Sequence, residues 1–286
     1  MRDFTADTIT QAVLDSVADT PDPRLRETMG ALVRHLHAFV REVEPSFSEW
    51  QAAIAFLTRT GQMCDAHRQE FILLSDTLGV SMLVDAINHR MPPGATETTV
   101  LGPFFVQSAP EMPDGADISG GLPGEPLVVT GRVSSADGTP LPGATVDVWH
   151  ADEDGFYDVQ HLAQTGGLAG RARFRADAEG RFSFRTIMPN WYPIPADGPV
   201  GDMLAATGRH PNRPAHVHFM IGAPGHETLI THIFAADSPW LESDAVFGVK
   251  TSLIADFPRH APDGAGGAGF RSLDYAFGLK PSAAAG

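Results

Sequence analysis

Apolar residues in the first third of the chain recur at the spacing of an α-helix. Ile9, Val13 and Val17, for example, lie on one helical stripe, as expected of an amphipathic helix. The sequence Asp22-Pro23 is a typical helix start, and the Pro-Pro-Gly sequence of residues 92–94 is a firm stop. We therefore predict four or five helices in this region.

The pattern changes to period two after a connector rich in Pro, Gly and Ser over residues 95–124. Short apolar and polar alternations separated by turn sequences predict β-strands. We expect strands at residues 127–133, 144–150, 181–187, 215–221 and 229–234. Short strands without intervening helical patterns favour a β-sandwich over alternating βα units. The predicted fold class is α+β, with an N-terminal helical domain over residues 1–95 and an antiparallel β-sandwich domain, including the connector, over residues 96–286.

Charge and cysteine content exclude several classes of function. The formal net charge is −15, so a polyanion such as nucleic acid would be repelled. Cys64 is the only cysteine, which excludes an internal disulfide and a thiolate metal cluster and fits a reducing compartment. The N-terminus lacks the apolar segment of a signal peptide, and no stretch of about 18 apolar residues occurs. We expect a cytoplasmic protein without a membrane span.

One pair of histidines has the spacing of metal ligands on a strand. Residues i and i+2 of a strand point to the same face, so His216 and His218 present two imidazoles side by side. The residues between and after them, Val217 and Phe219, are apolar enough to face the core. A pair of hydrogen-bonded core or surface histidines is the alternative interpretation of this pattern.

Further ligands must come from other residue types, because no acidic residue stands beside the pair as in zinc hydrolases. Tyrosine is rare, with 3 residues against 17 phenylalanines. Tyr157 and Tyr192 adjoin turn sequences, whereas Tyr275 is interpreted as structural. A phenol has a pKa of about 10, so a phenolate ligand at neutral pH requires a strong Lewis acid such as ferric iron. A place in the core is the alternative for either tyrosine.

Four motifs, in this order, resemble those of the intradiol ring-cleavage dioxygenases, iron(III) enzymes that open an aromatic ring between adjacent hydroxylated carbons. They are residues 101–104 (LGPF), 148–157 (VWHADEDGFY), 184–187 (FRTI) and 208–219 (GRHPNRPAHVHF). The resemblance covers nearly the whole chain. It implies one Fe(III) per subunit, bound by Tyr157, Tyr192, His216 and His218, with Tyr192 dissociating when substrate binds.

Within that family, three stretches are most similar to the hydroxyquinol 1,2-dioxygenases: residues 74–82 (LSDTLGVSM), 192–202 (YPIPADGPVGD) and 243–250 (SDAVFGVK). His232 stands where catechol-type members tend to carry glutamine, which points to the same group. The implied reaction cleaves hydroxyquinol (1,2,4-trihydroxybenzene) with O2 to 3-hydroxy-cis,cis-muconate or its tautomer maleylacetate. Catechol or chlorocatechol 1,2-dioxygenase activity is the alternative.

The subgroup pattern also implies a set of residues around the substrate ring. They are Leu73, Asp76, Leu101, Gly102, Pro103, Phe104, Ile194, Pro195, Arg213 and Val246. Asp76 could accept a hydrogen bond from the third ring hydroxyl, or could instead cap the helix that follows it. Arg213 is expected to stabilise negative charge on the substrate, with a structural salt bridge as the alternative. His232 is expected to assist through a hydrogen bond near the metal.

The family resemblance further implies an assembly. Its N-terminal helices form much of a dimer interface and enclose an apolar channel that can hold a lipid, so we expect a two-fold homodimer with space for a phospholipid. Two functions from other classes remain as rivals. A zinc hydrolase would use His216, His218 and His232 as a three-histidine site, and a non-catalytic β-sandwich binding module would carry these side chains by chance.

Overall fold

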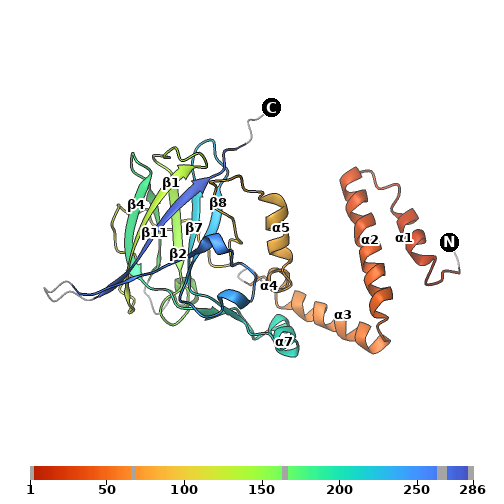
Figure 1. Ribbon diagram of the computed structural model, residues 1–286. Helices are drawn as coiled ribbons and strands as arrows, with labels where there is room; N and C mark the ends of the chain where they lie inside the picture. The colour runs from red at the N-terminus through yellow and green to blue at the C-terminus, as the bar shows by residue number, and fades with distance from the viewer. Residues whose placement is uncertain (1–2, 66–67, 163–166, 263–268, 283–286) are drawn as a thin grey trace. The chain divides into compact units, whose positions relative to one another are not determined.

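The computed structural model describes residues 3–65, 68–162, 167–262 and 269–282. The chain divides into two compact units, Met1–Arg59 and Thr60–Gly286. Helices come first and a sheet-rich region follows (Figure 1), which confirms the predicted α+β fold class. The domain boundary that the sequence places at residue 95 stays a prediction. None of the helices in the described parts of the chain is long and apolar enough to cross a lipid bilayer.

The first unit contains α1 (Ile9–Ser16), α2 (Pro23–Val43) and most of α3 (Phe47–Gln62). Helix α2 begins where the sequence predicts. The carboxylate of Asp22 accepts hydrogen bonds from the backbone N–H groups of Arg24 and Leu25, and Pro23 occupies the first helical position, where its missing N–H costs nothing.

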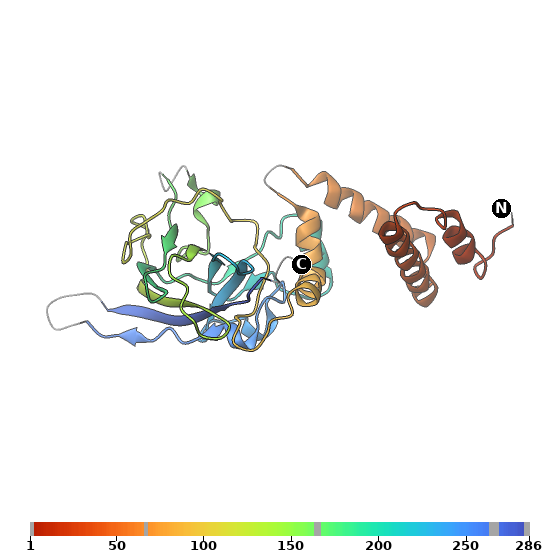
Figure 2. The same ribbon diagram turned by 90° about the horizontal axis from the view of Figure 1, so that it is seen from above.

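In the residues that the structure describes, the second unit contains the helices α4 (Glu70–Thr77), α5 (Val80–Asn88) and α7 (Pro199–Ala206). They lie together on one side of the sheets (Figures 1 and 2), and α4 contacts both α5 and α7. Helix α7 was not predicted, although Pro199 at its first position is a start signal. Its eight residues lie inside the strand-rich half of the sequence, where a single short helix has too few turns to display a clear period.

Two sheets form the sandwich. The four-stranded sheet has the order β10-β11-β1-β4, and the five-stranded sheet has the order β3-β2-β7-β8-β9. The strands of the first sheet are β1 (Pro126–Ser135), β4 (Arg181–Ile187), β10 (Arg259–His260) and β11 (Phe270–Leu279). Those of the second are β2 (Thr145–His150), β3 (Arg171–Arg175), β7 (His216–Gly222), β8 (Leu229–Ala235) and β9 (Ile254–Ala255). A separate pair joins β5 (Tyr192–Pro193) to β6 (Asn212–Arg213).

The sandwich is not purely antiparallel, which corrects the prediction in one respect. Strand β11 pairs with β1 in parallel, and β9 pairs with β8 in parallel. Two strands joined by a hairpin must run antiparallel. Strands β1 and β11 are separated by most of the domain, so this constraint does not apply to them. Their relative direction therefore cannot be predicted from the local sequence pattern.

The core lies between the two sheets and follows the period of two. Val217, Phe219 and Ile221 of β7 point inward. The ring of Phe219 packs against Phe182 of β4 and Phe277 of β11, with centroids 6.3 and 4.7 Å apart. The alternate residues of β7 therefore face outward, away from this core, and this outer face of the five-stranded sheet carries the polar cluster described next.

Candidate metal centre

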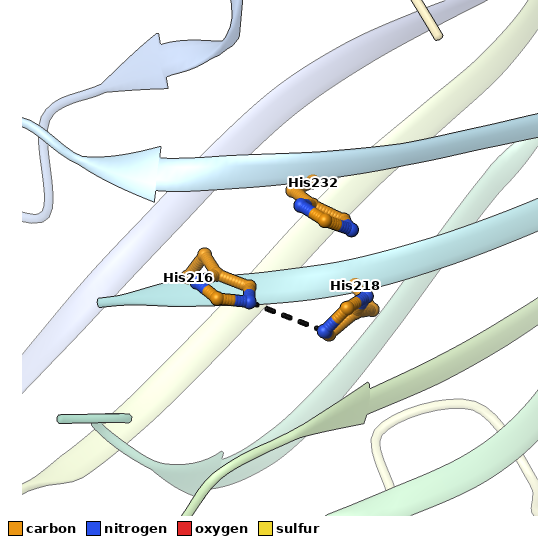
Figure 3. Close-up of side chains that lie close together, drawn as sticks. All are labelled: His216, His218 and His232. Atoms are coloured by element: carbon orange, nitrogen blue, oxygen red, sulfur yellow. Dashed lines mark hydrogen bonds between the residues drawn. The ribbon is translucent and has the colours of Figure 1, made fainter. Parts of the chain in front are cut away.

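His216 and His218 lie side by side on the outer face of β7, as the alternation predicts. Both are buried, and their Nε2 atoms are 3.1 Å apart (Figure 3). The Nδ1 atom of His216 lies 2.7 Å from the Pro214 carbonyl oxygen, so that nitrogen carries the hydrogen and donates it. The lone pair of the His216 Nε2 atom therefore points toward His218, and two such lone pairs repel unless a cation or a proton lies between them.

The two phenols complete the same cluster from segments that are distant in sequence, Tyr157 from the loop after β2 and Tyr192 from the short strand β5. The hydroxyl oxygen of Tyr157 lies 2.8 Å from His218 Nε2, 3.4 Å from His216 Nε2 and 3.5 Å from the hydroxyl oxygen of Tyr192. Gly155 allows this approach. Its φ is +85°, and a Cβ there would lie 2.8 Å from the Cβ of Tyr192, so only glycine fits between the two segments.

The spacing of the four donor atoms fits one metal ion. Ligand atoms about 2.0–2.1 Å from a common ion lie roughly 2.8–3.5 Å from one another, which is the range of the four distances above. Burial, followed by the neighbouring Tyr192, raises the pKa of Tyr157 well above its ordinary value. Deprotonation of this phenol at neutral pH therefore requires a strongly polarising cation, and two phenols with two neutral imidazoles suit ferric iron.

The third histidine of the cluster, His232, lies on β8 directly opposite His218 (Figure 3). One nitrogen of each of the three rings lies within 4.8 Å of the others, yet both nitrogens of His232 already have partners. Its Nε2 is 2.9 Å from the carbonyl oxygen of Val100, to which it donates, and its Nδ1 is 3.4 Å from Nη2 of Arg213, from which it accepts. Because both ring nitrogens of His232 are engaged in these contacts, they disfavour a three-histidine zinc site.

Arg213 stands between the phenols and a buried carboxylate. Its Nε and Nη2 donate to Asp244 at 3.0 and 3.3 Å, and its Nη1 reaches the Tyr192 hydroxyl at 3.5 Å. Burial is the largest single influence on the pKa of Arg213 and would lower it, but the charge of Asp244, the two phenols and the hydrogen bond to Asp244 together raise this pKa. Arg213 thus forms the buried salt bridge that one interpretation of the sequence expects. Its guanidinium also lies next to the Tyr192 hydroxyl, as the other interpretation requires.

Most of the predicted substrate residues surround the cluster. Leu73, Leu101, Phe104, Ile194 and Val246 belong to the apolar cluster that contains Tyr157 and Tyr192. The ring of Phe104 stacks on Tyr157, with centroids 4.4 Å apart. A Cβ on Gly102 would lie 3.3 Å from the His218 ring. Pro103 is exposed and Pro195 half-buried, and their contact with substrate stays a prediction.

Asp76 lies in the last turn of α4, where the helix dipole disfavours a carboxylate. Burial raises its pKa most, whereas a hydrogen bond with the Ser81 side chain and the charge of Arg213 oppose that rise. The capping alternative is not what the structure shows, because the residue that precedes α5 at its N-cap is Gly79, with no side-chain cap. Asp76 is therefore a half-buried carboxylate within electrostatic range of Arg213.

Several residues of the site were missed in the sequence. Asp244 is one, and the ion pair between Asp158 and Arg171 is another. Trp149 is a third, since its ring stacks on His218 with centroids 4.6 Å apart. The signal for Trp149 was its place next to the core residue Val148 of β2, which puts it on the same outer face as His218. Nothing in the local sequence distinguishes the buried arginine and aspartates from surface charges.

The chain matches known proteins along nearly its whole length. Residues 22–96 match the family model described as catechol dioxygenase N terminus, and residues 100–281 match the one described as dioxygenase. A 6-chlorohydroxyquinol 1,2-dioxygenase of Cupriavidus pinatubonensis is 52% identical over 286 residues, which cover 99% of this chain and 100% of the relative. A hydroxyquinol 1,2-dioxygenase of Rhizobium sp. is 54% identical over 256 residues, which cover 90% of this chain and 87% of the relative.

The solved structure of a hydroxyquinol 1,2-dioxygenase from Pseudomonas putida superposes with a TM-score of 0.91 at 48% identity, covering 97% of this chain and 99% of that one. Similarity of this extent includes the helical region, the sandwich and the segments that carry the two phenols and the imidazole pair. The chain belongs to the intradiol ring-cleavage dioxygenases.

Proposed function

We propose that this protein binds one ferric ion through Tyr157, Tyr192, His216 and His218, and cleaves hydroxyquinol between its two adjacent hydroxylated carbons with O2. The observation that carries the proposal is the convergence of two phenol oxygens and two imidazole nitrogens at distances of 2.8–3.5 Å. Both atoms of O2 enter the product, so the triol gains two oxygen atoms and keeps all its hydrogens, and becomes 3-hydroxy-cis,cis-muconate or its tautomer maleylacetate.

A ferric ion held by Tyr157, Tyr192, His216 and His218 would supply a Lewis acid that favours the deprotonated form of the substrate hydroxyls. The chain supplies the proton acceptor. The Tyr192 oxygen takes up a proton that the substrate loses, and Arg213, whose Nη1 is 3.5 Å from that oxygen, orients the phenol. The same guanidinium stabilises negative charge as it develops on the substrate.

The neighbouring side chains exclude water and orient the ring. The aromatic ring of Phe104 covers Tyr157, and Leu73 and Val246 close the apolar cluster around the phenols. His232 donates to the Val100 carbonyl and accepts from Arg213, so we propose that it aligns the guanidinium next to the residues that bind the ion.

We propose that Asp76 selects the triol. Its half-buried carboxylate can accept a hydrogen bond from the third hydroxyl of hydroxyquinol, whereas catechol would leave that acceptor unpaired, at about 1–3 kcal/mol. A chlorinated hydroxyquinol is the second candidate substrate, because the relative from Cupriavidus pinatubonensis is named for one.

For the assembly, we propose a two-fold homodimer that uses the N-terminal helices, with a phospholipid in an apolar channel at the interface. Support comes from apolar side chains of α2, since Leu32, Leu36 and Phe39 are each more than half exposed in the single chain. Light scattering after size exclusion tests the dimer, and mass spectrometry of a lipid extract tests the phospholipid.

The function is tested by loading the purified protein with ferric iron and recording visible absorption and oxygen uptake. We expect a tyrosinate-to-iron charge-transfer band and fastest uptake with hydroxyquinol among hydroxyquinol, 6-chlorohydroxyquinol, catechol and chlorocatechol. His218→Ala should bleach the band. A zinc hydrolase would be colourless and would consume no oxygen, as would a binding module, so a colourless iron-replete protein would overturn the proposal.

A further inference from the structure

A second buried ion pair lies directly behind Tyr157. Arg171 is the first residue of β3, and Asp158 opens the 3-10 turn η1 (Asp158–Gln160) that follows Tyr157. Their side chains are 2% and 1% exposed. Nε of Arg171 donates to one carboxylate oxygen at 2.7 Å, and its Nη2 donates to the other. The pair is bidentate, which fixes the geometry of both groups.

The rest of the Asp158 carboxylate is also used. It accepts hydrogen bonds from the backbone N–H groups of Val159 at 2.8 Å and Ala169 at 3.0 Å. On the other side of the turn, the side chain of Gln160 accepts from the backbone N–H of Tyr157 at 2.8 Å. The backbone that carries the Tyr157 phenol is therefore held at both ends.

Arg171 has a third contact, which reaches the opposite side of the same phenol. Its Nη1 donates to the carbonyl oxygen of Phe104 at 2.9 Å, and the ring of Phe104 stacks on the ring of Tyr157. One guanidinium thus joins the segment that carries the phenol to the ring that covers it. Arg171 also contributes a positive charge that acts on Tyr157 and on His218.

From these contacts we propose that the Asp158–Arg171 pair is a positioning pair, which sets the orientation and the donor strength of Tyr157 toward the metal. The inference rests on the proposed function, since it assigns a role in holding the proposed ligand. It concerns residues that do not touch substrate. The purely structural alternative is that the pair only fastens the edge strand β3 to the loop.

The chain contains a control pair on the same strand, with the same fork but a more exposed arginine, 31% against 2%. Arg173 is two residues further along β3 and forms the same fork with Asp147, at 2.8 and 3.0 Å. Its Nη2 also donates to a connector carbonyl, that of Gln107, at 3.5 Å. Neither Asp147 nor Gln107 contacts Tyr157 in the part of the chain that the structure describes. Variants of both pairs should lose stability, but only variants of the Asp158–Arg171 pair should also change the environment of the Tyr157 phenol. The comparison therefore separates the two effects.

The test compares Arg171→Lys and Asp158→Asn with Arg173→Lys and Asp147→Asn, all loaded with ferric iron. We measure the maximum of the charge-transfer band, the rate of iron loss to a chelator and the melting temperature. Arg171→Lys and Asp158→Asn should shift the band and release iron roughly 10- to 100-fold faster, as is typical when a partner that orients a metal ligand is removed. The Arg173 and Asp147 variants should keep the band and the release rate of the unsubstituted protein.

The inference is overturned if all four variants lose similar thermal stability while band and release rate stay unchanged. If Arg171→Lys does not fold, the test relies on the comparison of Asp158→Asn with Asp147→Asn, because the asparagine preserves the size of the side chain. If neither folds while the control variants do, the pair is structural and the inference fails. A missing band in the unsubstituted protein would instead contradict the proposed function.

Discussion

The ion pair between Arg213 and Asp244 permits a quantitative test of how the site is held. The two side chains are 4% and 2% exposed. Besides the fork from Arg213, Asp244 accepts a hydrogen bond from the backbone N–H of Gly248 at 2.9 Å. Each charge is thus compensated almost entirely by the other, and neither has access to water.

Removing one partner leaves the other buried and uncompensated. We expect Asp244→Leu to lower the free energy of unfolding by about 3–5 kcal/mol, and Arg213→Met by a similar amount. Replacing both by apolar residues removes the desolvation cost together with the attraction, so the double variant should lie within about 2 kcal/mol of the unsubstituted protein. The two losses are therefore expected to be strongly non-additive.

Urea denaturation of the four metal-free proteins measures this cycle. Losses that add within about 0.5 kcal/mol would refute the reasoning, because they would show that the two groups do not compensate each other. In the double variant, stability should be restored but enzymatic activity should not. The iron-loaded double variant should turn over about 100- to 1,000-fold more slowly than the unsubstituted enzyme, since the guanidinium that reaches Tyr192 is absent.

Substitutions at three other positions test substrate recognition by Asp76, proton uptake by Tyr192 and the effect of the buried His150 on stability. For Asp76→Asn, the ratio of kcat/KM for hydroxyquinol to that for catechol should fall about 5- to 150-fold, and an unchanged ratio would remove Asp76 from substrate recognition. Tyr192→Phe should keep a charge-transfer band from Tyr157 but lose most turnover, so full activity would contradict its role as proton acceptor. Burial lowers the pKa of His150, so the native imidazole stays neutral while the unfolded chain binds a proton below about pH 6.5. The free energy of unfolding should then fall as the pH drops from about 6.5 toward the lowered native pKa, by at most roughly 1.4 kcal/mol per unit from this residue. Urea denaturation of His150→Gln should show a shallower decline.

The alternation of β7 is the part of the site that the sequence predicts directly. A period of two requires His216 and His218 to share a face, and the apolar residues that alternate with them, Val217 and Phe219, identify which face meets the core. The phenols are different, because Tyr157 lies on a loop and Tyr192 on the short strand β5, 35 residues apart in sequence. Their meeting depends on the close approach at Gly155, so it could be anticipated only through the family resemblance.

Buried charges were the hardest feature to predict. The sequence of β3, Arg-Ala-Arg-Phe-Arg, alternates as a strand does, but its arginines indicate a solvent-exposed face. In the structure Arg171 is buried because Asp158, 13 residues earlier, supplies its counter-charge. Asp244 is likewise buried because it pairs with Arg213, 31 residues before it. A pairing of this kind depends on the tertiary fold, so the local hydrophobic pattern does not predict it.

The electrostatics around the two phenols show why we expect them to behave differently. The two guanidinium groups near the cluster, Arg171 and Arg213, are each balanced by a carboxylate, so these pairs bring no net charge to it. Two phenolates around a trivalent cation leave one positive charge, and a doubly deprotonated catechol would turn it into one negative charge in a buried site, which is costly. Protonation of one phenolate removes that cost. Tyr192 suits this role because Arg213 reaches its oxygen, whereas Tyr157 lies 2.8 Å from His218, beneath Phe104 and next to the anchored turn. The surrounding residues thus restrain two chemically identical side chains unequally, and this asymmetry is what the protein adds to the chemistry of the ion.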